Sequence, residues 1–86
     1  MSDNIAEFAA AFNEEALFAD GLDEAFIGMA ERAGQNTIAC YDTQKVIDTL
    51  VERDGMTREE ALEYFQFNIV GAYVGENTPV FIFLKE

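Results

Sequence analysis

The chain has 86 residues, half of them apolar, and a formal charge of −12 from 17 acidic and five basic side chains. This length and apolar content fit one packed domain, and the charge excludes direct binding to DNA, RNA or an anionic membrane, which all require Lys and Arg. Cys40 is the only cysteine, so the chain can form neither an intrachain disulfide nor a cysteine-based zinc site. A cytoplasmic location is expected, because no signal peptide or membrane span is recognisable and a lone cysteine suits a reducing compartment.

The first expected element is a short amphipathic helix over residues 3–13. Its apolar side chains recur at helical spacing and form one narrow stripe, which consists of Ile5, Phe8, Ala9 and Phe12. Residues 16–19 follow as a short apolar run that ends at the turn-forming pair Asp20-Gly21. This run fits either a strand or a continuation of the first helix.

Two elements are expected before the middle of the chain. Residues 23–33 carry apolar side chains at helical spacing and are followed by Gly34, which predicts a second helix with a left-handed glycine at its end. Residues 37–41 (Thr-Ile-Ala-Cys-Tyr) predict a strand.

A helix over residues 43–53 is expected next. Asp42 can cap its first turn, and Gly55 is placed to end it. Its apolar side chains form one face, made of Val46, Ile47, Leu50 and Val51.

The pattern T-x-x-E at Thr57 and Glu60 predicts a capping box, in which each side chain satisfies the other residue's backbone N–H. The helix behind it is expected over residues 58–70, fading near Gly71 or Gly75. Its buried side chains are expected to be Ala61, Leu62, Phe65 and Ile69.

Residues 80–84 (Val-Phe-Ile-Phe-Leu) predict a last strand that is apolar on both faces. A sheet with helices on one side leaves its other face wet, so either the pair Phe81/Phe83 or the pair Val80/Leu84 would be exposed. We expect the first helix or another subunit to cover that face.

These elements predict an α+β fold in one domain over residues 1–86. A small, three-stranded sheet packs against two to three helices. Residues 1–15 form an extra N-terminal amphipathic helix, which lies outside the core or covers the back of the sheet. Residues 16–86 form the core.

Four stretches carry a resemblance to a known group of proteins: FADGLDEAFIG (18–28), ACYD (39–42), DGMTREEA (54–61) and EYFQFNIVGAYVGENTPVF (63–81). On these, residues 17–83 resemble a family of small uncharacterised proteins encoded by phages, prophages and some bacterial genomes. The resemblance implies a small gene carried by a mobile element and expressed in a bacterial host cell. It implies no particular activity, and the first 15 residues lie outside it.

No position makes a convincing catalytic centre. Asp20, Asp23 and Glu24 could gather a hard cation such as Mg²⁺, but their spacing is not that of an EF-hand loop. Acids at a helix start are more simply explained by the helix dipole. Cys40 has no histidine to act as its base, since the chain contains none, and core packing is the favoured role for it.

The region after the last long helix contains no phosphate-binding motif, because neither Gly71 nor Gly75 is followed by G-K-[ST]. Polar residues stand there among apolar ones, and they fit either a hydrogen-bonded turn or a small recognition surface. These residues are Asn68, Tyr73, Glu76, Asn77 and Thr78. Together these readings predict a protein that is not an enzyme and uses no cofactor.

Charge is the strongest functional signal. The first 31 residues carry eight acids and no basic residue, so these acids are expected to lack a local counter-charge. One role for such acidity is to keep the protein soluble. The other is mimicry of a nucleic-acid backbone, in which the carboxylates occupy the Lys/Arg surface that a nucleic-acid-binding protein uses for phosphates. The expected partner-binding residues are Glu14, Glu15, Asp20, Asp23, Glu24, Tyr73 and Glu76.

The favoured function is therefore binding to a host protein or complex with a basic surface, as an inhibitor of a nucleic-acid-handling defence system of the anti-CRISPR kind. This is an analogy from charge and genomic context. The alternatives are a homodimeric structural or regulatory accessory protein, an antitoxin-like partner of a basic toxin and, less favoured, a small metal-dependent enzyme that uses Asp20, Asp23 and Glu24.

Overall fold

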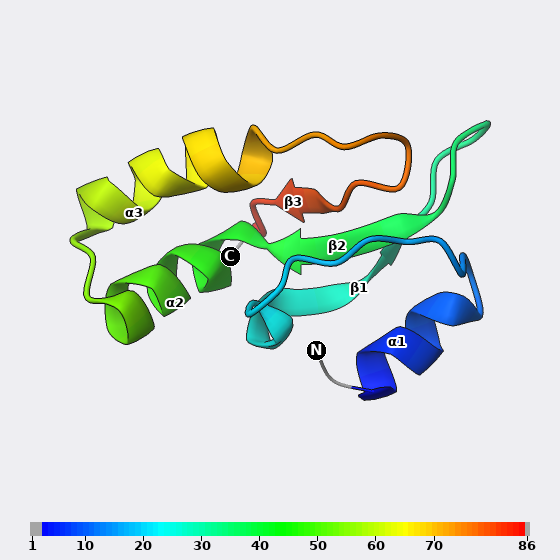
Figure 1. Ribbon diagram of the computed structural model, residues 1–86, viewed down its shortest axis with the longest axis horizontal. Helices are drawn as coiled ribbons and strands as arrows, with labels where there is room; N and C mark the ends of the chain where they lie inside the picture. The colour runs from blue at the N-terminus through cyan, green and yellow to red at the C-terminus, as the bar shows by residue number, and fades with distance from the viewer. Residues whose placement is uncertain (1–2, 86) are drawn as a thin grey trace.

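The computed structural model describes residues 3–85, which form three α-helices and a three-stranded sheet (Figure 1). In chain order the elements are α1 (Asp3–Ala10), the 3-10 turn η1 (Asp23–Ala25), β1 (Phe26–Ala30), β2 (Ile38–Asp42), α2 (Thr43–Asp54), α3 (Arg58–Tyr64), its π-helical continuation η2 (Phe65–Val70) and β3 (Val80–Ile82). The expected α+β fold, with an N-terminal helix and a small sheet, is confirmed.

The central strand of the sheet is β2, with β1 antiparallel on one side and β3 parallel on the other. The register places Tyr41 between Phe26 of β1 and Phe81 of β3. The ring centroids of these neighbours lie 5.7 and 5.5 Å from that of Tyr41, which is fully buried. This row of rings forms the sheet side of the core.

The helical side of the core comes from α2 and α3. The apolar face of α2 buries Val46, Ile47 and Leu50, and α3 with η2 buries Ala61 and Phe65. The ring of Phe65 meets the edge of Phe81 at 5.3 Å between centroids, which joins the helices to the sheet. Leu62, which was expected in this core, is exposed, because it lies beside the narrow helix face on which Ala61 and Phe65 are buried.

Local signals set the ends of both helices as expected. The carboxylate of Asp42 accepts a hydrogen bond of 3.0 Å from the Gln44 N–H, which caps α2. Gly55 ends α2 with a φ of 70°, a left-handed conformation that glycine adopts without a steric penalty. The capping box is complete, since the Glu60 N–H donates to Thr57 Oγ1 at 3.1 Å and the Thr57 N–H donates to Glu60 Oε1 at 2.9 Å.

The helix expected over residues 23–33 does not form, and this prediction was wrong. Only the short turn η1 is helical there, and the chain continues as β1. The register of β1 on β2 shifts between Phe26 and Gly28, and Gly28 adopts a φ of 147° at this irregularity. Glycine is a poor helix former but fits a β-bulge, so pairing with β2 prevailed over the helical spacing.

Residues 16–19 are neither strand nor helix, although both had been considered. They cross the core face of the sheet as an irregular segment (Figure 1). The Leu17 N–H donates to the Asn77 carbonyl at 3.1 Å, and the Ala19 N–H donates to the Tyr41 hydroxyl at 2.9 Å. Since a loop carbonyl and a side chain satisfy these backbone groups, no strand ladder is required.

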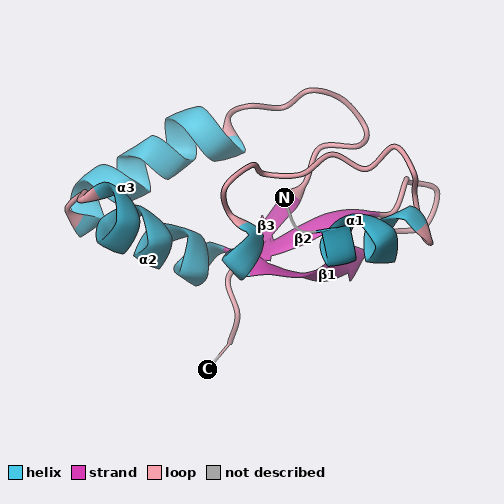
Figure 2. Ribbon diagram, turned by 60° about the horizontal axis from the view of Figure 1, so that its bottom comes forward, coloured by secondary structure: helices cyan, strands magenta, loops and turns pink. Residues whose placement is uncertain are grey.

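The last strand is shorter than expected and ends at Ile82. Phe83 and Leu84 lie beyond it and are exposed, whereas Phe81 packs against the core. The back of the sheet is not covered by α1. Instead Phe8 of α1 meets Phe26 edge-on, on the same face as Tyr41, and α1 lies beside β1 at the margin of the core (Figure 2).

Candidate functional site

The seven residues expected to contact a partner are mainly at the surface. Asp23 is partly buried, and the other six are exposed: Glu14, Glu15, Asp20, Glu24, Tyr73 and Glu76. The structure divides them between two places. One lies near the loop before β3, and the other lies beside the C-terminal end of α2.

Three asparagines hold the first group together. The side-chain amide of Asn13 donates to the Thr37 carbonyl at 2.9 Å and to Asn77 Oδ1 at 2.8 Å, and Asn36 donates to the same oxygen at 3.1 Å. The turn that carries Glu14 and Glu15 therefore lies against the loop that carries Tyr73 and Glu76.

The loop before β3 is itself hydrogen-bonded. The Val74 N–H donates to Thr78 Oγ1 at 2.9 Å, and the Thr78 N–H donates to the Gly75 carbonyl at 3.2 Å. Asn77 and Thr78 thus form the hydrogen-bonded turn that was one of the two readings of this region. Tyr73 and Glu76 project from it and remain accessible.

Asp20, Asp23 and Glu24 form the second group, and Arg53 of α2 lies among them. Its guanidinium donates to the Gly21 carbonyl and pairs with Asp54, with 3.0 Å between Arg53 Nε and Asp54 Oδ1. The bond to Asp54 raises the pKa of Arg53, to which the charge of Glu24 adds, and it lowers the pKa of the Asp54 carboxyl. Among the acids of the first third, Glu24 therefore has a counter-charge nearby, which corrects the expectation for that residue.

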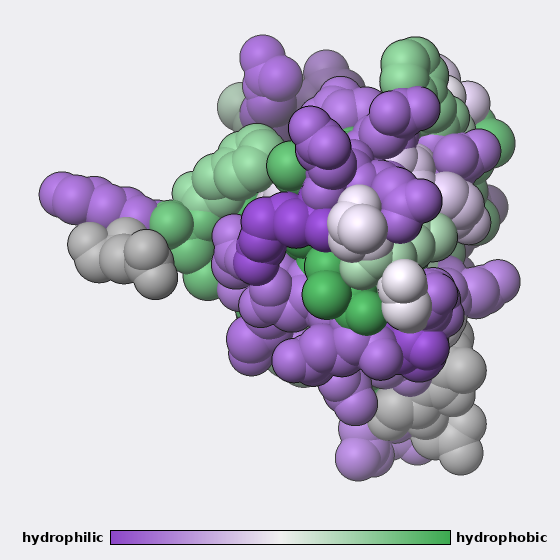
Figure 3. Space-filling view, turned by 90° about the vertical axis from the view of Figure 1, so that its left-hand side faces the viewer, coloured by the Kyte–Doolittle hydropathy of each residue, from purple (hydrophilic) through white to green (hydrophobic). Residues whose placement is uncertain are grey.

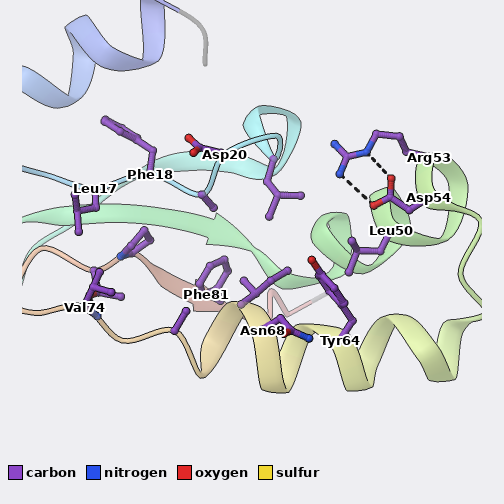
Figure 4. A pocket seen from close by; sticks show the side chains of 16 residues that line it. Leu17, Phe18, Asp20, Leu50, Arg53, Asp54, Tyr64, Asn68, Val74 and Phe81 are labelled. Atoms are coloured by element: carbon purple, nitrogen blue, oxygen red, sulfur yellow. Dashed lines mark hydrogen bonds and ion pairs between the residues drawn. The ribbon is translucent and has the colours of Figure 1, made fainter.

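A pocket of about 460 Å³ lies next to Arg53, between residues 17–22 and η2 (Figure 4). Leu17, Phe18 and Asp20 come from one wall, and Tyr64 and Asn68 come from the helix opposite. Its volume is in the range of small-molecule and side-chain pockets. The full lining consists of Leu17, Phe18, Ala19, Asp20, Leu22, Leu50, Arg53, Asp54, Tyr64, Asn68, Ile69, Ala72, Val74, Thr78, Pro79 and Phe81.

This pocket was not predicted from the sequence. Asn68 and Asp20 had been singled out, but nothing in the spacing of Arg53 or Tyr64 indicated that they would share a cavity with residues 17–22. Asn68, a polar residue among apolar ones near the end of the helix, is the one signal that pointed there.

Cys40 is buried in β2, in agreement with the core-packing role expected for it. Burial raises the pKa of its thiol. A raised pKa lowers the fraction of reactive thiolate at neutral pH.

Within residues 3–85, no three carboxylate or cysteine side chains gather closely enough to hold a metal ion. In the same part of the chain, no helix combines the length and the apolar character needed to cross a bilayer.

Comparison of the chain with protein-family models, with characterised proteins and with solved structures finds no match.

Proposed function

We propose that this protein acts by binding a host protein or complex with a basic surface, and that it inhibits a nucleic-acid-handling defence complex in the manner of anti-CRISPR proteins. The carrying observation is the accessible acidity of the first third, where Glu14, Glu15, Asp20 and Glu24 are exposed. The proposal also includes origin from a phage or other mobile element and a place in the cytoplasm of the bacterial host.

The surface charge supports this proposal. Twelve carboxylates are exposed in residues 4–85: Glu7, Glu14, Glu15, Asp20, Glu24, Glu31, Glu52, Asp54, Glu59, Glu60, Glu63 and Glu76. Two of the five basic residues are already engaged in ion pairs, Arg53 with Asp54 and Arg58 with Asp48. Figure 3, which looks at the end formed by α2 and α3, shows hydrophilic side chains over most of that face.

The arrangement of the acids suggests how such a partner would be engaged. Two acidic groups stand on a folded scaffold, one at Glu14 and Glu15 and one at Asp20 and Glu24, so the fold sets the backbone positions that carry them. Two such anionic sites can occupy two phosphate positions on a nucleic-acid-binding protein. The pocket beside Asp20 can accept an apolar side chain of the same partner.

The experiment is affinity capture from a bacterial lysate, read by mass spectrometry. We expect a nucleic-acid-binding complex that is retained at about 0.05 M salt and released at about 0.5 M, because the screening length falls severalfold. Capture of a single small basic protein would favour the antitoxin-like function instead. Recovery of this chain alone, as a dimer, would favour the accessory protein.

Matched charge variants test the site on the captured partner. The double variants Glu14→Gln/Glu15→Gln and Asp20→Asn/Glu24→Gln each remove two exposed acids, and at least one of them should weaken binding by about tenfold or more. The control Glu31→Gln/Glu59→Gln removes the same charge from elsewhere and should bind like the parent. If all three variants bind as tightly as the parent at every salt concentration, the acidity serves solubility only.

A further inference from the structure

The outer side of α3 and η2 carries apolar side chains that the fold does not use. Phe67 is 77% exposed and Tyr64 is 42% exposed, although Ala61 and Phe65 of the same helical segment are buried in the core. A single exposed apolar residue is ordinary, but two aromatic side chains three positions apart on one helix face mark a contact surface.

Part of this face is hollowed into a shallow groove of about 580 Å³, lined by Met56, Glu60, Glu63, Tyr64, Phe67 and Asn68. Four of these residues follow Glu60 by three, four, seven and eight positions: Glu63, Tyr64, Phe67 and Asn68. This is the spacing of residues along one face of a helix. Apolar and aromatic side chains therefore lie beside two carboxylates along one line of the surface.

The carboxylates of Glu60 and Glu63 indicate which kind of partner the groove can bind. A second copy of this chain would bring its own Glu60 and Glu63 toward the same carboxylates, and the charge of −12 on each chain would add to the repulsion. A helix with Lys or Arg beside its apolar side chains avoids this cost. Its cations can pair with Glu63 and lie over the rings of Tyr64 and Phe67.

We propose that the groove formed by Met56, Glu60, Glu63, Tyr64, Phe67 and Asn68 binds an amphipathic helix that carries Lys or Arg next to its apolar side chains. The groove shares Tyr64 and Asn68 with the pocket beside Asp20, but it includes none of the acids between Glu14 and Glu24. The proposal goes beyond the function proposed above and does not depend on it.

Two designed helical peptides of about 18 residues serve as probes, a length at which an amphipathic helix can form. Both carry leucines on one face, with lysines on the other face of the first peptide and glutamates on that of the second. Calorimetric titration should show binding of the Leu/Lys peptide and none of the Leu/Glu peptide. Equal binding of the two would overturn the proposal, because the carboxylates would then have no role.

Variants locate the contact. Phe67→Ala should weaken binding of the Leu/Lys peptide by about tenfold or more, as expected of an aromatic anchor, and Glu63→Gln should weaken it severalfold. The matched controls are Glu7→Gln on α1 and Phe12→Ala in the turn that follows it, which remove the same groups from other exposed positions and should bind like the parent. If these control variants lose as much affinity as the groove variants, the groove is not the binding site of the peptide.

A last comparison separates this inference from the proposed function. Asp20→Asn/Glu24→Gln should bind the Leu/Lys peptide like the parent, even where it loses the host partner. Loss of peptide binding in that variant, with Phe67→Ala unaffected, would place the contact at the acidic group and refute the groove.

Discussion

Tyr41 links three parts of the molecule through one side chain. Its ring lies between Phe26 and Phe81 in the sheet, and its hydroxyl accepts the Ala19 N–H at 2.9 Å. Burial raises the pKa of Tyr41, and the charges of Asp23 and Asp20 act in the same direction, while the hydrogen bond from Ala19 acts against them. The side chain therefore holds the irregular segment 16–19 on the core and stays neutral while it does so.

Tyr41→Phe should destabilise the fold by about 1 kcal/mol, because the partly buried Ala19 N–H loses its acceptor. Urea melts at neutral pH measure this. Tyr73→Phe is the matched control, since Tyr73 is exposed, and its midpoint should equal that of the parent. A Tyr41→Phe midpoint equal to both would mean that the hydrogen bond contributes nothing to stability.

The same side chain predicts a loss of stability at alkaline pH. The pKa of Tyr41 is raised in the fold, whereas in the unfolded chain it is about 10, so above that pH the unfolded chain binds fewer protons and stability falls. Below about pH 10 the contribution of Tyr41 protonation to the stability of the fold is fully present. The comparison is made in a Cys40→Ala background, because Cys40 is the other buried acid with a raised pKa. Between about pH 9.5 and 11, the double variant Cys40→Ala/Tyr41→Phe should lose less stability than the single variant Cys40→Ala. If the stability of the two variants falls equally over this range, the pKa of Tyr41 is not raised.

At the level of elements, the boundary between α2 and α3 is set by side chains close in sequence. Gly55 turns the chain out of α2, and the reciprocal hydrogen bonds of Thr57 and Glu60 start α3 two residues later. This places Ala61 and Phe65 on the buried side of α3, and Glu60, Glu63 and Phe67 on its outer side. The cap therefore fixes which face of the helix is offered to a partner.

Thr57→Ala should cost about 1 kcal/mol of stability, because the Glu60 N–H loses its acceptor. Thr57→Ser keeps that oxygen and should melt close to the parent in denaturant. Unchanged midpoints in both variants would show that the capping box, although formed, does not stabilise α3.

At the scale of the whole molecule, the charge is spread over a compact body with a Cα radius of gyration of 12.9 Å. The exposed carboxylates greatly outnumber the five basic side chains, and two of those five are held in ion pairs. The other three, Arg32, Lys45 and Lys85, are too few to form a cationic surface of the size needed to follow a phosphate backbone.

The protein should therefore not bind DNA or RNA by itself. Gel-shift titration at about 50 mM salt, where phosphate contacts are strongest, checks this with duplex and single-stranded probes. A complex with micromolar affinity would refute the argument from charge, and with it the reason for expecting a protein partner that has a basic surface.

Features that depend on neighbours within a few residues can be predicted from the amino-acid order. The cap of α2 at Asp42, its end at Gly55 and the capping box at Thr57 each depend on groups two to five positions apart, and all three were predicted correctly. β2 was predicted within one residue at each end, and the acidity of the first third needs only a count of side chains.

Features that depend on distant partners arise only when the chain folds. Residues 23–33 have a helical pattern, but β1 forms there because β2 supplies a ladder for Phe26 to Ala30. Segment 16–19 is held by a hydrogen bond between Ala19 and Tyr41, 22 positions apart. Asn13 is hydrogen-bonded to Asn77, 64 positions away. Arg53 reaches Gly21 over 32 positions, which gives the acidic group its counter-charge and one wall of the pocket. The spacing of nearby residues does not predict such contacts, because their energy is gained only when the chain folds back on itself.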